Sequence, residues 1–200
     1  SDEKSTAIVN LGGFCNVTVL PANCKPKEVR GLDVCCCNLL LNKIANDRLG
    51  YEYDKGGKEA KEGTINNKVY ASLFQKLTEQ KNANRSLGTN DDLGEYALNI
   101  GKSLDTPDLL ATSIAAIGAC IAQATSDVDR VLLAGGGVHN KELSQAIKNN
   151  GTTETLGVPT QAREAMAMAI LGALAQDGVS IALPQITGRR KTEDLVGWAQ

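Results

Sequence analysis

Residues 130–140 read Arg130-Val-Leu-Leu-Ala-Gly-Gly-Gly-Val-His-Asn140, and the rest of the chain can be placed relative to this stretch. A short apolar run that ends at glycine is typical of a buried strand. Three glycines in a row allow a ligand to approach the backbone closely. We expect a helix to begin near Asn140, with the positive end of its dipole facing whatever lies over the turn. Such turns also occur for packing alone, so a ligand site and a packing turn are both open at this point.

The composition is that of a globular chain with balanced charge. Its 200 residues are 42% hydrophobic, which is enough for a core, and 21 Lys and Arg stand against 23 Asp and Glu. The basic run from Gly188 to Lys191 is short, so we do not expect a nucleic acid partner. We expect no apolar stretch of about 18 residues and find no signal-peptide character at Ser1, so a cytoplasmic location is the default expectation.

The six cysteines are Cys15, Cys24, Cys120 and the adjacent trio at 35–37. Neighbouring side chains on a helix or strand point in different directions, so the trio is not expected to converge on a metal ion. Reduced structural thiols are the main interpretation, because cysteine is usually buried. The alternative is a thiolate activated by the helix that follows the trio.

The hydrophobic periodicity predicts an α/β fold that contains a mixed sheet. Asp105, followed by Pro107 and Asp108, predicts the capped start of a long helix rich in small residues. Strands are expected at 6–11, 16–20, 28–34, 131–134 and 152–156, the first two joined in a hairpin, and 183–188 is expected to be extended. Helices are expected at 36–49, 58–63, 65–80, 94–100, 109–124, 141–149 and 160–175. The polar segment 81–93 is expected to be a mobile or substrate-facing loop.

This order of elements implies three antiparallel strands followed by parallel strands, with helices on both faces of the sheet. It matches the RNase H-like half-domain of the sugar kinase, actin and heat-shock chaperone superfamily. We therefore expect residues 1–200 to form a single nucleotide-binding domain, with a helical insertion at about 54–104.

Several motifs resemble one family of that superfamily. The segment Asn10-Leu-Gly-Gly-Phe-Cys-Asn16 is similar to the Asn-Leu/Ile-Gly-Gly-x-x-Asn hairpin of the anhydro-N-acetylmuramic acid kinase family, which also includes levoglucosan kinase. The resemblance continues in order along almost the whole chain, at Gly31-Leu-Asp33 with Asn38, Tyr53-Asp-Lys55 with Gly57, Asp108 to Thr112, Gly135-Gly-Gly137 with Asn140, Gly157-Val-Pro159, Glu164-Ala165, and Leu183-Pro184 with Thr187-Gly188.

The resemblance implies an ATP-dependent, Mg²⁺-assisted kinase that phosphorylates a 1,6-anhydro sugar and opens its anhydro bridge by hydrolysis, as in cell-wall recycling. Phosphoryl transfer depends mainly on positioning and charge stabilisation. The hairpin would hold the terminal phosphates and the glycine turn the adenosine, through Asn10, Gly12, Gly13, Asn16, Gly135, Gly136, Gly137 and Asn140. Asp33 and Asn38 are expected at the head of the first helix near the sugar cleft, although Asp33 could instead cap that helix.

The chain also departs from the family in two respects. Members of the family carry an additional N-terminal half, with a second phosphate hairpin and the Asp that activates water. We therefore expect no catalytic residue in this chain, and either the missing half or self-association to cover its open side. The sugar-side motifs have changed: Thr-Gly-Pro-Gly is replaced by Val34-Cys-Cys-Cys37, Asp-Lys-Asp-Gly by Asp54-Lys-Gly-Gly57, and Lys-Ser-Thr-Gly-Arg-Glu by Arg85 to Asn90, with Asp91 and Asp92 as possible substitutes.

Two other functions are considered. The chain could be a non-catalytic member that binds a nucleotide or a partner without turnover. It could also be a dinucleotide-binding oxidoreductase that uses the glycine turn and Glu154. The second is disfavoured, because the third glycine of G-x-G-x-x-G is replaced by Asn140 and the turn does not follow the first strand.

Overall fold

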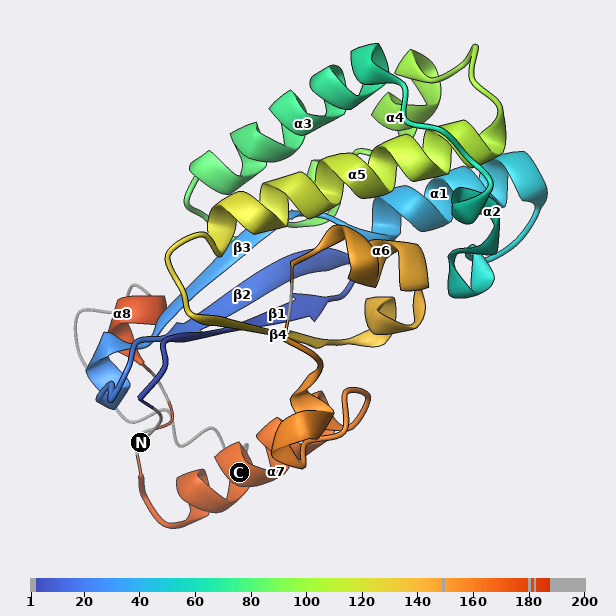
Figure 1. Cartoon of the computed structure of the whole chain (residues 1–200). Helices are drawn as coiled ribbons and strands as arrows, with labels where there is room; N and C mark the ends of the chain where they lie inside the picture. The colour runs from blue at the N-terminus through green and yellow to red at the C-terminus, as the bar shows by residue number, and fades with distance from the viewer. Residues whose placement is uncertain (1–2, 149, 180, 182, 188–200) are drawn as a thin grey trace.

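The computed structural model describes residues 3–148, 150–179, 181 and 183–187. These residues form one four-stranded sheet with helices around it (Figure 1). The strand order is β3-β2-β1-β4. β2 runs antiparallel to both of its neighbours, and β4 runs parallel to β1. This mixed sheet confirms the predicted fold class. The strands are β1 (Thr6–Leu11), β2 (Phe14–Leu20), β3 (Arg30–Cys36) and β4 (Arg130–Ala134).

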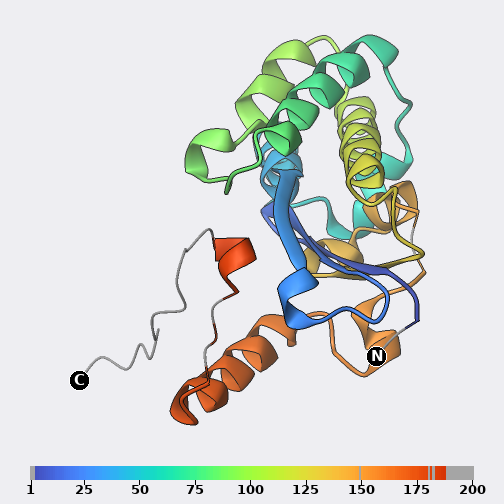
Figure 2. The same ribbon diagram turned by 90° about the vertical axis from the view of Figure 1, so that its left-hand side faces the viewer.

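The helices are unequally divided between the two sides of the sheet. Figures 1 and 2 show α1, α3, α4 and α5 stacked on one side and α7 on the other. The α-helices are α1 (Asn38–Leu49), α2 (Lys58–Lys61), α3 (Asn67–Asn82), α4 (Gly94–Ile100), α5 (Thr106–Ala124), α6 (Lys141–Ala146), α7 (Arg163–Gln176) and α8 (Pro184–Thr187). Short 3-10 turns lie at η1 (Pro26–Glu28), η2 (Lys55–Gly57), η3 (Thr89–Asp91), η4 (Gly136–His139) and η5 (Thr153–Leu156).

The core lies between α1, α3, α5 and one face of the sheet. Alternate residues of a strand point to the same face, and directly paired residues share it. The buried residues Val9 of β1, Val17 of β2 and Leu133 of β4 are cross-strand partners on this face. The opposite face carries the pairs Asn10 with Asn16 and Asn16 with Asp33, so it is much more polar.

Helix α5 is the central helix of the core. The Asp105 side chain accepts a hydrogen bond from Asp108 N (3.0 Å), which confirms the predicted cap. Contrary to the expectation from the sequence, α5 is long and apolar enough to cross a membrane, with a mean hydropathy of 1.3. Its apolar side chains are part of the core cluster, which explains its composition in a globular fold.

Two predicted elements are wrong. Residues 153–156 form the 3-10 turn η5, and Thr152 makes only an isolated bridge to Leu133. The backbone N–H and hydroxyl of Thr155 both donate to Thr152 O (3.1 and 2.8 Å), a local arrangement that competes with strand pairing. Residues 184–187 form the helical turn α8 where extended chain was predicted, and Gly188 lies outside the described residues. In addition, β3 begins two residues later than predicted.

Candidate functional site

The three glycines of the turn after β4 have different environments. Gly135 has φ +84°, and a Cβ on it would lie 2.6 Å from Asn10 Oδ1. A Cβ on Gly137 would lie 2.6 Å from Leu11 Cβ. Both glycines therefore allow the turn to pack against the end of β1. Gly136 is exposed and would have nothing within 4 Å of its Cβ, so it is the glycine of this turn whose backbone is open to a ligand.

The β1–β2 hairpin caps the first helix. Asn38 N donates to Gly12 O (3.1 Å), and Leu39 N donates to Gly13 O (3.2 Å). The first N–H groups of α1 are thus already used, and the start of this helix is no free anion site. The N–H of a trans peptide points opposite to its carbonyl, and all described peptide bonds are trans. The N–H groups of Gly13 and Phe14 therefore point away from α1.

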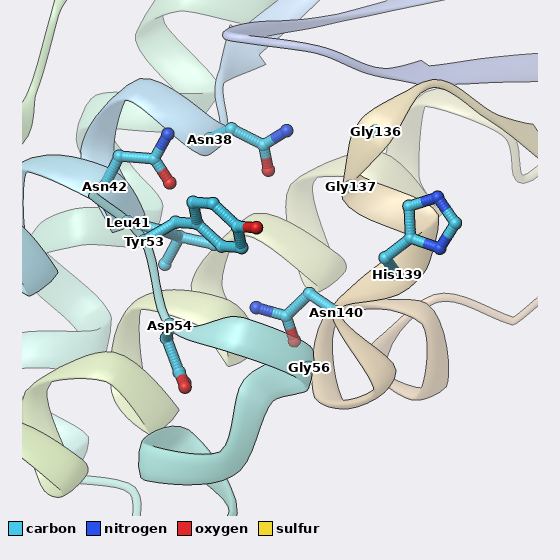
Figure 3. Close-up of a pocket in the computed structure, with 10 residues that line it drawn as sticks. All are labelled: Asn38, Leu41, Asn42, Tyr53, Asp54, Gly56, Gly136, Gly137, His139 and Asn140. Atoms are coloured by element: carbon cyan, nitrogen blue, oxygen red, sulfur yellow. The ribbon is translucent and has the colours of Figure 1, made fainter. Parts of the chain in front are cut away.

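A pocket of about 310 Å³ lies between α1, the loop 53–56 and the glycine turn, and we call it the glycine-turn pocket (Figure 3). Asn140 caps α6 by accepting from Leu143 N (3.1 Å), and Figure 3 shows its amide nitrogen pointing toward Tyr53 across the pocket. Asn38 Nδ2 donates to Leu11 O (3.0 Å). The pocket is lined by Asn38, Leu41, Asn42, Tyr53, Asp54, Gly56, Gly136, Gly137, His139 and Asn140.

The other predicted site residues form a polar row across the sheet. Asn10, Asn16 and Asp33 are successive cross-strand partners on β1, β2 and β3. Asn10 lines a cavity of about 210 Å³ together with Gly135 and Gly136, and we call this cavity the Asn10 pocket. Asn16 and Asp33 line a third cavity of about 490 Å³, the β3 pocket.

The three cavities are neighbours, because they share a lining residue or are lined by residues that pair across the sheet. Gly136 lines both the glycine-turn pocket and the Asn10 pocket, and Asn10 pairs with Asn16 of the β3 pocket. The predicted nucleotide residues thus lie around the ends of β1 and β4. They divide between the three cavities, except for Gly12 and Gly13, which line none of them.

Asp33 does not lie where it was predicted. It belongs to β3, and its carboxylate accepts from Leu87 N (2.8 Å), so it neither caps α1 nor lies at its head. The bulge between Cys15 and Asn16 shifts the β2–β3 register beside it, a feature that periodicity alone does not reveal. Asn38, by contrast, is the first residue of α1 and lines a different pocket from Asp33.

The two carboxylates considered as substitutes on the sugar side are already engaged. Asp91 forms a bidentate ion pair with Arg85 (2.6 and 2.9 Å), and Gly88 N also donates to it (2.8 Å). The Arg85 guanidinium and the Gly88 N–H lower the pKa of Asp91 from 3.8 to about 2. Asp92 Oδ1 accepts from Gly94 N (2.8 Å). Both carboxylates hold the loop 85–94 together.

The cysteine trio is buried. Burial raises the pKa of Cys36 and of Cys37 to about 12. A hydrogen bond with Cys120, together with burial, raises the pKa of Cys35 well above its ordinary value. Thiols of this kind stay protonated at neutral pH, which favours the structural interpretation over an activated thiolate. Among the described residues, no group of three or more His, Cys, Asp or Glu could hold a metal ion.

Two lining residues had no assigned role in the sequence analysis. Arg163, the first residue of α7, lines the Asn10 pocket, and its Nε is buried without a hydrogen-bond partner among the described residues. Tyr53 lines the glycine-turn pocket. Tyr53 was part of a recognised motif. Arg163 was not, although it directly precedes the motif residues Glu164-Ala165.

Comparison with known proteins agrees with this arrangement of motifs. The family described as anhydro-N-acetylmuramic acid kinase matches residues 1–198. The chain is 28% identical to the anhydro-N-acetylmuramic acid kinase of Salinibacter ruber, over 93% of this chain and 51% of that protein. It is 32% identical to the enzyme of that name from Synechococcus elongatus (94% and 55%) and 30% identical to that from Paraburkholderia xenovorans (92% and 53%). The chain thus spans about half the length of the curated relatives it matches.

Proposed function

The chain belongs to the anhydro-N-acetylmuramic acid kinase family, and from this premise we propose that it is the nucleotide-binding half of an ATP-dependent kinase for a 1,6-anhydro sugar. In this proposal the reaction requires a second half, since the relatives are about twice as long as this chain. That half would supply the group that activates water, so the chain alone is inactive.

One observation carries the proposal. Gly135 and Gly137 are packed against β1, and between them Gly136 exposes its backbone at the junction of the glycine-turn pocket and the Asn10 pocket. A packing turn would need no open glycine at its centre. The pocket volume of about 310 Å³ lies within the usual range for small-molecule sites, which begins at roughly 300 Å³.

The residues present fit a nucleoside triphosphate. The adenosine would occupy the glycine-turn pocket, and the phosphates would pass Gly136 toward the outward N–H groups of Gly13 and Phe14. Arg163 would supply the positive charge, because guanidinium groups bind phosphate oxygens well. Mg²⁺ would arrive bound to the phosphates, where it neutralises charge during phosphoryl transfer. The row from Asn16 to Asp33 would face the acceptor sugar.

Isothermal titration calorimetry of the 200-residue chain tests the nucleotide site. Mg²⁺-ATP should bind and NAD⁺ should not. Gly136→Val should abolish ATP binding without unfolding, because its side chain would enter open space in the pocket. Gly172→Val in α7 is the matched control, since that position is equally open, and it should bind ATP normally. Equal ATP affinity in both variants would overturn the site.

Turnover provides the second test. The chain alone should not phosphorylate 1,6-anhydro-N-acetylmuramic acid in the presence of Mg²⁺-ATP. Product formation would contradict the assignment of water activation to a second half. Absence of heat with any nucleotide would favour the alternative function, a partner-binding member without a nucleotide.

A further inference from the structure

One residue in the wall of the glycine-turn pocket is aromatic. Tyr53 is 50% exposed although it lines the pocket, and Figure 3 shows its ring lying between the Asn38–Asn42 side and the Asn140 side. Among the described residues the one stacked ring pair is Tyr70 with Phe74, so the ring of Tyr53 stacks on no other aromatic side chain there.

The backbone around Tyr53 is nevertheless held firmly. The buried carboxylate of the next residue, Asp54, accepts from Glu59 N and Ala60 N (both 3.0 Å). Gly57, at φ +74°, packs so closely on the cap of α6 that a Cβ there would lie 2.4 Å from Asn140 Oδ1. The loop is thus fixed to α2 on one side and to the glycine turn on the other. A rigid loop that presents a half-exposed ring is a preorganised binding surface.

The groups around the ring match the edges of a heterocyclic base. Asn140 Oδ1 is occupied by its cap to Leu143 N, which leaves Nδ2 as a donor toward the pocket. Asn38 Nδ2 donates to Leu11 O, and Asn38 Oδ1 accepts a weak hydrogen bond from Cys37 Sγ (3.9 Å). Because an amide oxygen has two lone pairs, Oδ1 keeps one acceptor position for a ligand. Leu41 and Asn42 come from the next turn of α1. An aromatic face with amide donors and acceptors at its rim is the combination that recognises a nucleobase.

From these contacts we infer that Tyr53 is the stacking platform for the nucleotide base and that Asn38 and Asn140 read the edges of that base. This inference rests on the proposed nucleotide function and adds to it the residues that bind the base. According to this inference, different residues bind different parts of the nucleotide. The loop 53–57 contributes to binding of the base alone, whereas Gly136 and Arg163 contribute to binding near the phosphates.

The test compares whole nucleotides with their parts in calorimetric titrations. Tyr53→Ala should weaken Mg²⁺-ATP and adenosine binding about tenfold, the order expected when a ring is removed from a stacked base. Binding of inorganic triphosphate should be unchanged. Tyr53→Phe keeps the ring and should stay within about twofold of the parent chain. Tyr51→Ala removes an exposed ring outside this pocket and should have no effect.

The outcomes distinguish a failure of the inference alone from a failure of the proposed function. If Tyr53→Ala binds ATP as the parent chain does while Gly136→Val does not, the site stands and the platform is wrong. If Tyr53→Ala weakens triphosphate as much as adenosine, base stacking is also overturned. If the parent chain binds no nucleotide, the proposed function and the inference fall together. Because Tyr53 is half exposed, its variants should melt within a few degrees of the parent chain, as circular dichroism will check.

Discussion

Helices α5 and α7 are both rich in alanine, yet they lie in opposite environments. Leu109, Ile117 and Ile121 of α5 are fully buried. In α7 the large apolar residues Met168 and Ile170 are 69% and 57% exposed. The two helices lie on opposite sides of the sheet (Figure 2).

The difference follows from the two faces of the sheet. The face toward α5 presents Val9, Val17 and Leu133, so an apolar helix gains free energy by covering it. The face toward α7 presents the polar row from Asn10 to Asp33. Alanine-rich composition predicts a helix, but burial depends on what the facing strand offers. We therefore expect the side of the sheet covered by α5 to exclude water, which makes it the dry side. We expect the side that faces α7 to be accessible to solvent, which makes it the open side. The two expectations can be tested separately.

Thiol labelling gives the largest expected contrast between the dry core and the surface. Raising the pKa of Cys36 and Cys37 from 9.0 to about 12 lowers their thiolate fraction about a thousandfold at neutral pH. Cys24, which is only half buried, should react rapidly with a thiol reagent, while the five buried cysteines should react only after unfolding. Peptide mass mapping identifies the labelled sites. Cys24→Ser should remove the fast phase, and a fast phase from any of the trio would contradict a dry core.

Truncating an isoleucine in each helix tests burial directly. Ile117→Ala in α5 should destabilise the chain by about 2–5 kcal/mol, because it removes fully buried methyl groups and leaves a cavity. Ile170→Ala in α7 should change the free energy of unfolding by less than about 0.5 kcal/mol. Urea denaturation measures both. A comparable loss in the two variants would show that α7 is buried in solution.

A glycine-to-alanine pair should give effects of opposite sign. In α5 a Cβ on Gly118 would lie 2.7 Å from Ala146 O of α6, so Gly118→Ala should cost about 1–3 kcal/mol through overpacking. In α7 a Cβ on Gly172 meets nothing within 4 Å, so Gly172→Ala should gain up to about 1 kcal/mol of helix propensity. Thermal melting distinguishes the signs, and a stabilised Gly118→Ala would mean that α5 and α6 pack less closely.

Sequence information was sufficient for the elements that depend on local patterns. The hairpin, β4, α4 and the capped start of α5 were predicted closely, because each depends on local periodicity and on a cap such as Asp105. The errors concern features decided by tertiary contacts. Asp33 faces a loop 54 residues away, and η5 replaces a strand because local threonine hydrogen bonds outcompete pairing with β4.

The sequence predicted which residues belong to the candidate site better than it predicted what each residue does there. The sequence identified all three glycines of the turn after β4, and only the packing against β1 reveals that Gly136 is the open one. Tyr53 was visible as a motif residue without a function. The position of Arg163 in the Asn10 pocket depends on where α7 begins in space, which no local pattern determines.

The smallest expected effect concerns the open side, at the loop that Arg85 closes. The pKa of Asp91 is held at about 2, below its ordinary 3.8, so the ion pair contributes stability above pH 3.8 that is lost as the pH falls toward 2. In Arg85→Ala the pKa should rise toward 3.8, with the Gly88 N–H still holding it somewhat lower. The stability difference between parent and variant should therefore be present at neutral pH and vanish near pH 2.

An NMR titration of the Asp91 carboxyl measures its pKa, and urea denaturation at neutral pH and near pH 2 measures the stability difference. Arg30→Ala, which removes an exposed pair with Asp127, is the control. An unchanged Asp91 pKa in Arg85→Ala would mean that backbone N–H groups alone hold the loop, and that Arg85 is free to meet a ligand in the β3 pocket.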